Sequence, residues 1–315
     1  MKKKVLGKTG ITMTEITLGA LTMGPLQAKL STTEAKKVIL AALDKGINSI
    51  DTAEMYGMDE PIKAALSEYR GEVILASKST ATSYSEMEKS VLGALSGLGR
   101  DYLDIFYLHA AKVTPEVFEE RSGAFQCLLD YKSKGVIRAV GIATHVVPVV
   151  EKAAKIEEID VVFPLINVKG VGIVGGSAAD MVRAIKLVSE SGKGLVAMKS
   201  LAGGNLLREI KTAFSFVRNI EGITSVAVGM SHVDEVEVNV RLFEDEDIME
   251  SDLERLRSTK ELFVARFCTG CGTCVQACPN EALTVKEGQV IVEKNKCILC
   301  GYCNPTCPEF ALRLI

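Results

Sequence analysis

The first 240 residues alternate between short apolar runs and amphipathic runs with helical spacing. The apolar runs lack polar alternation, which is typical of parallel strands covered by helices. The helical runs tend to end in glycine, as helix C-termini do. Eight such units, at a spacing of roughly 30 residues, predict a (β/α)8 barrel of the TIM type, with a doubly wound sheet as the alternative. The predicted strands are residues 16–21, 48–53, 73–79, 103–109, 137–144, 161–168, 194–200 and 224–230.

The bulk properties set limits on location and partners. A net charge of −3 gives no electrostatic footprint for nucleic acid. No uncharged apolar run approaches the roughly 20 residues that span a bilayer, so we expect no membrane association. The opening MKKK precedes no apolar segment, which argues against a secretory signal. We therefore expect a cytoplasmic protein. In such a protein, metal binding is a better interpretation of the nine cysteines than disulfide formation.

Eight of those cysteines form two copies of the pattern C-x2-C-x2-C-x3-C-P near the end of the chain. The first three cysteines of such a run bind one [4Fe–4S] cluster, and the fourth binds the other cluster. One cluster is therefore expected on Cys268, Cys271, Cys274 and Cys307, and a second on Cys297, Cys300, Cys303 and Cys278. Two zinc sites or four disulfides are the alternatives, but zinc ligands come as spaced pairs rather than triplets.

Residues from about Ala265 to Leu314 resemble the bacterial two-cluster ferredoxins. Between the two cysteine runs, residues 282–295 predict a hairpin that turns at Glu287 and Gly288. Cys127 lies apart, in an apolar helical run, and is expected to be a buried, unreactive thiol.

The expected organisation is a barrel over residues 1–242, an acidic helical linker over 243–264 and a small α+β ferredoxin-like domain over 265–315. The segment 170–175, GVGIVG, matches the dinucleotide pattern G-x-G-x-x-G. The acidic residue that should end the next strand is absent, because Lys199 stands there. A flexible loop at the barrel mouth is the favoured interpretation.

Polar residues cluster at the ends of three successive predicted strands. Asp51 ends the second strand and Tyr56 follows it, Lys78 lies near the end of the third, and His109 ends the fourth. Taken singly, each has a structural explanation as a cap, a packed ring, a solvated charge or a core histidine. In a barrel, however, the carboxyl ends of the strands meet at the face that carries catalysis.

The four residue types make chemical sense together. A phenol has a pKa near 10 and is a poor acid at neutral pH, and a neighbouring cation lowers that value. Lys78 is the expected cation, held in place by Asp51. Tyr56 could then protonate a carbonyl oxygen while hydride arrives at the carbon, with His109 orienting the carbonyl.

Residues from about Val5 to Asn239 resemble the aldo-keto reductase family. LGKTGITMTEITLG is similar to the opening hairpin and first strand of that family, and SIDTAEMYG, ILASKS and YLDIFYLH to the segments that carry its catalytic residues. The resemblance implies that Asp51, Tyr56, Lys78 and His109 are a catalytic tetrad. It also implies a nicotinamide cofactor, usually NADPH, and reduction of a carbonyl or oxidation of an alcohol.

On the cofactor side the resemblance is weaker. The positions that match cofactor-binding segments are Thr144, Asn167, Lys199, Gly203 and Asn239. Ala143, Phe163, Met198, Gly229 and Glu235 stand where the family usually has other residues. A carboxylate at Glu235 should repel a 2′-phosphate, so NADH is slightly favoured over NADPH.

Two redox modules in one chain raise a question of electron count, because a cluster moves one electron at a time and a hydride carries two. A flavin commonly links the two processes and remains compatible with the sequence. The leading hypothesis is a reductase of a small carbonyl compound with an appended electron-transfer domain, and a redox partner protein is compatible with it. The alternatives are an electron-transfer protein whose barrel is a docking or ligand-binding scaffold, and a purely structural role for the clusters.

Overall fold

The computed structural model describes residues 1–315. Eight parallel strands close into a barrel in chain order, with the last strand, β10, beside the first, β3. All eight predicted strand positions are confirmed. The strands are β3 (Ile16–Gly19), β4 (Ser49–Asp51), β5 (Ile74–Ser79), β6 (Leu103–Ala110), β7 (Ile137–Thr144), β8 (Val161–Pro164), β9 (Gly194–Met198) and β10 (Ser225–Gly229).

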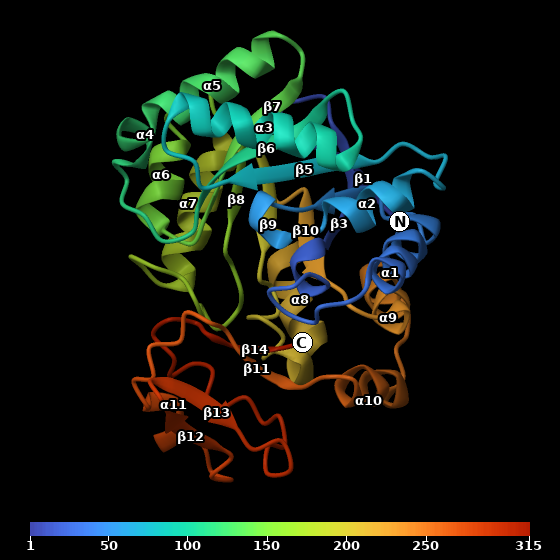
Figure 1. Ribbon diagram of the computed structural model, residues 1–315, viewed down its shortest axis with the longest axis vertical. Coiled ribbons are helices and arrows are strands. Elements are labelled where there is room, and N and C mark those ends of the chain that lie inside the picture. Colours follow the sequence, from blue (N-terminus) through green and yellow to red (C-terminus); the bar gives the residue numbers. More distant parts are fainter.

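Helices surround the barrel (Figure 1). They are α1 (Thr32–Asp44), α2 (Asp59–Leu66), α3 (Tyr84–Leu98), α4 (Val117–Glu120), α5 (Ser122–Ser133), α6 (Val147–Ala153), α7 (Ala178–Glu190), α8 (Ile210–Arg218) and α9 (Val233–Phe243), with 3-10 turns η1 (Ala20–Thr22), η2 (Glu54–Tyr56) and η3 (Leu207–Glu209). Serine begins α1, α3 and α7, and each of these serines forms a capping box with an acidic residue three positions later. Cys127 is fully buried in α5, as predicted. None of the helices combines the length and apolarity that a membrane crossing requires.

An antiparallel hairpin precedes the barrel, formed by β1 (Lys3–Val5) and β2 (Thr12–Thr14). Its apolar side chains Leu6, Ile11 and Met13 join the core cluster inside the barrel, which also contains Tyr107 and Phe163. The larger core cluster packs helices against the outside of the strands. The hairpin therefore fills the amino-terminal end of the barrel and leaves the carboxyl ends of the strands as the face that can hold a ligand.

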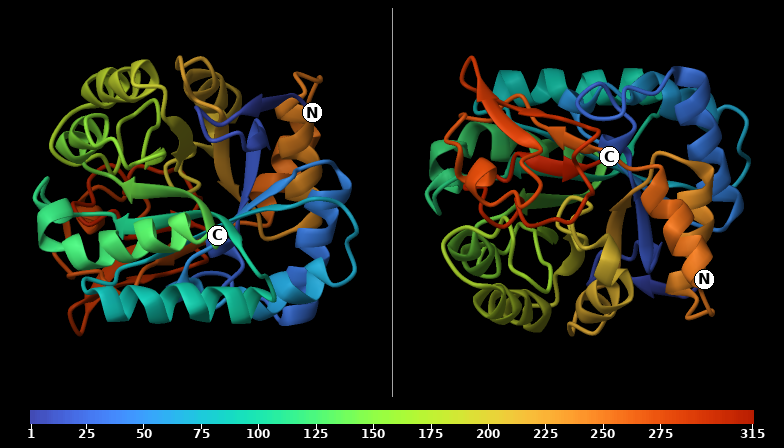
Figure 2. Two further views of the ribbon diagram at one scale, coloured as in Figure 1. Left: turned by 90° about the horizontal axis from the view of Figure 1, so that it is seen from above. Right: turned by 90° about the horizontal axis from the view of Figure 1, so that it is seen from below.

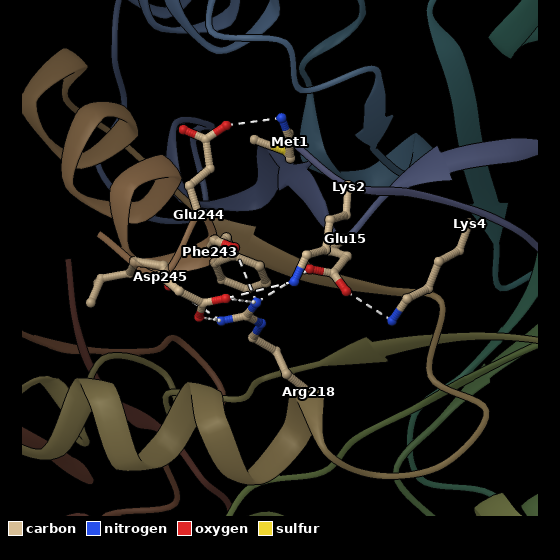
Figure 3. Close-up of polar contacts among 9 residues, drawn as sticks. Met1, Lys2, Lys4, Glu15, Arg218, Phe243, Glu244 and Asp245 are labelled. Atoms are coloured by element: carbon tan, nitrogen blue, oxygen red, sulfur yellow. Dashed lines mark hydrogen bonds and ion pairs between the residues drawn. The ribbon is translucent and has the colours of Figure 1, made fainter. Parts of the chain in front are cut away.

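A charged network fastens this hairpin to the outer helices (Figure 3). Arg218, the last residue of α8, donates to Asp245 at 2.6 Å and to the carbonyl oxygen of Phe243 at 3.0 Å. Its guanidinium also lies 3.3 Å from Glu15, which pairs with Lys4 at 2.8 Å. One arginine thus connects α8, the end of α9 and the hairpin.

The rest of the chain forms the helix α10 and a small α+β domain. The elements are α10 (Glu250–Ser258), β11 (Leu262–Val264), α11 (Thr273–Gln276), β12 (Leu283–Lys286), β13 (Gln289–Val292) and β14 (Leu312–Leu314). The pair β12–β13 is the expected hairpin, with Glu287 and Gly288 at its turn. Because β11 pairs with β14, the small domain begins within the segment expected to be linker.

The small domain lies against the carboxyl-terminal end of the barrel (Figures 1 and 2). The N–H of Leu314 donates to the carbonyl oxygen of Gly203 at 2.8 Å, and Lys112 pairs with Glu309 at 2.8 Å. The segment 170–175 lies between β8 and α7, where Gly172 faces Phe310. A Cβ atom at Gly172 would lie 3.1 Å from Leu165 and 3.3 Å from that ring, so glycine permits a close approach of the small domain at this loop.

A close approach inside the barrel gives a test of its packing. A Cβ atom at Gly141 of β7 would lie 2.5 Å from the carbonyl oxygen of Val161 and 2.6 Å from the Tyr107 ring. We expect Gly141→Ala to lower the free energy of unfolding by about 1–3 kcal/mol, the range for overpacking. Gly93→Ala is the matched control, because a Cβ atom there meets nothing within 4 Å in a helix interior. It should stabilise the protein by about 0.5–1 kcal/mol, and equal effects in chemical denaturation would contradict the packing account.

Candidate active site

A cavity of about 610 Å³ opens at the carboxyl ends of the strands. Its walls come from both parts of the chain. The barrel supplies Asp51, Tyr56, Lys78 and His109, together with the loop that follows β9. The small domain supplies residues on either side of its cysteine runs, among them Phe267, Phe310 and Arg313. The four predicted catalytic residues therefore line one space, which the ferredoxin-like domain helps to enclose.

A buried ion pair lies at the floor of this cavity. The Nζ of Lys78, on β5, donates to both carboxylate oxygens of Asp51 and to the carbonyl oxygen of Thr52, each at 2.7 Å. Both side chains are nearly inaccessible to solvent. Burial raises the pKa of Asp51 and lowers that of Lys78, and in each case the partner charge opposes the shift. Loss of either partner would leave an uncompensated buried charge.

Tyr56 lies at the end of η2, with Lys78 on one side of its ring and His109 on another. The Lys78 Nζ is 4.9 Å from the ring centroid, and the His109 ring stands nearly perpendicular at 6.2 Å. Burial and then the Asp51 charge raise the pKa of Tyr56, while Arg313 acts to lower it. The expectation that Lys78 lowers this pKa is wrong, because Asp51 and Thr52 satisfy the ammonium and burial dominates. Tyr56 is thus a phenol that keeps its proton throughout the neutral range.

His109 is neutral in this environment. Burial first, and then the charges of Lys78, Lys199 and Arg121, lower its pKa to about 3. Its Nδ1 atom is buried without a hydrogen-bond partner. A neutral imidazole beside Tyr56 can hydrogen-bond to an uncharged carbonyl group.

The predicted cofactor-binding residues divide into two groups. Lys199, Gly203 and Asn239 line the cavity. The Thr144 hydroxyl instead accepts the N–H of Val146 at 3.2 Å, and Asn167 forms two hydrogen bonds with the backbone of Val171, at 2.9 and 3.0 Å. These last two side chains brace the turns after β7 and β8, so the structure does not bring them to the cavity.

Glu235, on which the preference for NADH rests, is not an isolated charge. Its carboxylate pairs with Lys260 of the segment before β11 and accepts the N–H of Ser231 at 2.7 Å. Both side chains of the pair are buried and both residues line the cavity. Lys260 balances the charge that was expected to repel a 2′-phosphate, a partner that cannot be foreseen from the spacing of the two residues along the chain.

Cysteines of the two runs lie near one another in the small domain, and their division into two ligand sets stays a prediction. After burial, the charges that raise the pKa of Cys274 are those of Cys307, Cys268 and Cys271. For Cys303 the corresponding charges are those of Cys274, from the other predicted set, and then of Cys297 and Cys300. Backbone N–H groups of Ala282 and Ala311 donate to the sulfurs of Cys278 and Cys307, each at 3.3 Å. The chain thus provides thiolates and sulfur-directed donors of the kind that hold [4Fe–4S] clusters.

Sequence reasoning missed the residues that the small domain contributes to the cavity. Phe310 follows the fourth cysteine of the second run at the place where Glu281 follows that of the first, and both have positive φ. Glu281 is exposed, whereas Phe310 is buried against the barrel. The one available signal was this apolar substitution between two otherwise similar repeats.

The pKa of His109 gives a pH prediction for stability. An unfolded histidine, with a pKa near 6.5, binds a proton before the folded one, whose pKa is about 3. Stability should therefore fall as the pH drops from 6.5 towards 3, by up to about 1.4 kcal/mol per pH unit from this group. We expect His109→Gln to flatten the slope in urea unfolding measured between pH 6.5 and 4.5. The exposed His232, replaced by glutamine, is the control; equal slopes in wild type and His109→Gln would show that His109 is not buried neutral.

Comparison with known families agrees with this architecture. Residues 15–218 match the family model described as the aldo/keto reductase family. Residues 267–312 match the model of a 4Fe-4S dicluster domain. The two matches fall on the barrel and on the small domain respectively.

Individual relatives match parts of the chain. An uncharacterized oxidoreductase of Bacillus subtilis is 29% identical over 159 residues, which cover 46% of this chain and 49% of that protein. The L-galactose dehydrogenase of Arabidopsis thaliana is 25% identical over 82% of this chain and 93% of its own length. The chain spans about half the length of the Bacillus relative.

Solved structures show the same fold. A putative aldo-keto reductase from Pseudomonas aeruginosa superimposes with a TM-score of 0.68 at 22% identity, covering 77% of this chain and 94% of that one. The holo form of an aldo-keto reductase from Bacillus halodurans gives a TM-score of 0.65 at 21% identity, covering 82% and 96%. With the match of the family model to most of the barrel, these findings identify the chain as a member of the aldo/keto reductase family that carries a C-terminal 4Fe-4S dicluster domain.

Proposed function

We propose that the protein is a nicotinamide-dependent oxidoreductase that interconverts a carbonyl compound and its alcohol, with Tyr56 as the proton donor and acceptor. The observation that carries this proposal is the convergence of Tyr56, His109 and the buried Lys78–Asp51 pair on one cavity. Family membership supports it.

The roles of the four residues follow from their contacts. In reduction, the Tyr56 hydroxyl gives its proton to the substrate oxygen as charge develops there, and in oxidation it takes that proton back. The high pKa of Tyr56 keeps the proton in place until an alkoxide, a stronger base than phenolate, begins to form. The Lys78 ammonium, 4.9 Å from the ring centroid, favours a negative charge on Tyr56, whereas the Asp51 carboxylate opposes it. His109 orients the carbonyl by a hydrogen bond.

A nicotinamide cofactor fits the residues on the other side of the cavity. The Oδ1 atom of Asn239 is buried without a hydrogen-bond partner, although the residue lines the cavity. Such an acceptor calls for a donor from a ligand. Gly203 presents backbone at the same wall, and the Lys260–Glu235 pair lies nearby. When bound, the cofactor supplies or accepts the hydride at the carbonyl carbon. The preference for NADH over NADPH remains a prediction, weakened by the Lys260 partner of Glu235.

For the small domain we propose two [4Fe–4S] clusters, one on Cys268, Cys271, Cys274 and Cys307 and the other on Cys297, Cys300, Cys303 and Cys278. The proximity of Cys274 to the other three members of its set supports the first. When present, the clusters supply one-electron transfer. The first set adjoins the cavity, because Phe267 precedes Cys268 and Phe310 follows Cys307 within three residues.

Removal of the Tyr56 hydroxyl tests the proposed function. We expect Tyr56→Phe to lower turnover by about 10²–10⁴-fold, the usual contribution of a positioned acid–base group. Iron content should stay at the wild-type value, because the cysteines are untouched. The assay follows nicotinamide absorbance with a panel of aldehydes and ketones under anaerobic conditions.

Tyr107→Phe is the matched control, since Tyr107 is buried inside the same barrel but does not line the cavity. It should retain turnover. Turnover retained by Tyr56→Phe would remove Tyr56 from the mechanism. Absence of nicotinamide binding in the wild type would favour the alternative, in which the barrel is a scaffold for an electron-transfer domain.

A further inference from the structure

The charges that line the cavity are unequal in number. The acidic residues are each matched by a lysine, in the pairs Lys78–Asp51, Lys112–Glu309 and Lys260–Glu235. The lining also contains Lys199, Arg266 and Arg313, none of which forms an ion pair. Arg266 is exposed and screened by water, whereas Lys199 and Arg313 are partly buried. The cavity therefore holds two enclosed cations without counterions.

Both of these cations lie beside the same aromatic ring, that of Phe310. The Lys199 Nζ is 5.8 Å from the centroid of the Phe310 ring, and the Arg313 guanidinium carbon is 5.5 Å from it. Arg313 also lies 5.6 Å from the Phe267 ring. Aromatic faces attract a cation but do not neutralise it. Neither side chain forms a hydrogen bond within the chain, and the Arg313 Nε is buried without a partner.

Both side chains are desolvated, and the charge of Arg313 acts on Lys199. Burial lowers the pKa of Lys199 well below its ordinary value, and the Arg313 charge lowers it further. Burial lowers the pKa of Arg313 as well. Two desolvated like charges raise the free energy of the folded state, and an anion bound within reach of both would relieve both penalties. An arginine presents a planar fork that matches a carboxylate or a phosphate.

Arg313 lies near the proposed proton donor, Tyr56. Arg313 is close enough to Tyr56 for its charge to oppose the rise in the pKa of that phenol. An anionic group on Arg313 and a carbonyl oxygen at Tyr56 can thus belong to one small molecule. Arg313 reaches the site from β14, which the Leu314–Gly203 hydrogen bond fixes to the barrel.

We propose that Lys199 and Arg313 form an anion-binding subsite for the substrate, so that the preferred substrates are carbonyl compounds, or their alcohols, that carry a carboxylate or phosphate group. This inference rests on the proposed function, and it assigns Lys199 to the substrate rather than to the cofactor. The ferredoxin-like domain accordingly supplies a substrate-binding residue as well as cluster ligands.

The test compares 4-oxopentanoate with its methyl ester, which differ in charge and share the ketone. Calorimetry of the full, cluster-replete chain gives both dissociation constants without requiring turnover. We expect the acid to bind at least about 10-fold more tightly than the ester, as hydrogen bonds to charged groups allow. Arg313→Gln and Lys199→Gln should each reduce this ratio towards one, and Arg313→Lys should restore part of it. Arg266→Gln, which removes an exposed cation from the same rim, should keep the ratio.

As a control for folding, each variant must have the iron content and the melting temperature of the wild type. Equal binding of acid and ester by the wild type would overturn the subsite even if neutral carbonyl compounds are turned over. Arg313-dependent binding of the acid without turnover of any carbonyl would sustain the subsite and refute the proposed reaction. If Arg313→Gln and Lys199→Gln weakened NADH and NADPH instead and left the acid-to-ester ratio intact, the cations would serve a cofactor phosphate and the proposal would fail.

Discussion

The last strand of the chain, β14, forms backbone hydrogen bonds both within the small domain and with the barrel. These hydrogen bonds determine which residues line the active-site cavity. Strand β14 pairs with β11, and the N–H of Leu314 donates to Gly203 in the loop after β9. Backbone hydrogen bonds of this kind fix Arg313 and Phe310 over the open end of the barrel. A barrel alone would present the tetrad to solvent on that side. With β14 in place, the proton transfer proposed for Tyr56 would take place in a partly enclosed, desolvated space where charges act more strongly.

Desolvation explains most of the electrostatics of the site. The buried Lys78–Asp51 pair is stable because each charge compensates the other for the loss of hydration. Removal of one partner would lower the free energy of unfolding by about 3–5 kcal/mol. The same burial keeps His109 neutral and Tyr56 protonated. Lys199 and Arg313 are the exceptions, since neither forms an ion pair and the Asp51 charge that acts on Lys199 is already paired with Lys78. The cavity therefore has ion-paired side chains at its floor and two unpaired cations at one wall. Such a cavity favours ligands that carry a negative charge.

The sequence predicts those features of the site that depend on residues close together in the chain, and it does not predict contacts between distant segments. The strands, the hairpin at Glu287 and Gly288, and the convergence of Asp51, Tyr56, Lys78 and His109 all follow from local patterns and from the fixed direction of parallel strands. Lys260 beside Glu235 and Phe310 against Gly172 are contacts between segments distant in the chain, and no spacing rule relates them. The pKa of Tyr56 was mispredicted for a related reason: a nearby cation lowers the pKa of a phenol only if burial does not outweigh it, and burial follows from the whole fold.

The small domain that carries the proposed clusters forms one wall of the barrel's cavity, and cluster spectroscopy tests this arrangement most directly. Protein reduced with dithionite is titrated anaerobically with NADH and, separately, NADPH, while nicotinamide fluorescence reports binding and EPR reports the clusters. Because Phe267 and Phe310 flank Cys268 and Cys307 and line the cavity, we predict that cofactor binding changes the EPR signal of one cluster in proportion to occupancy. Saturable binding with an unchanged signal, or no binding of either nucleotide, would contradict this arrangement.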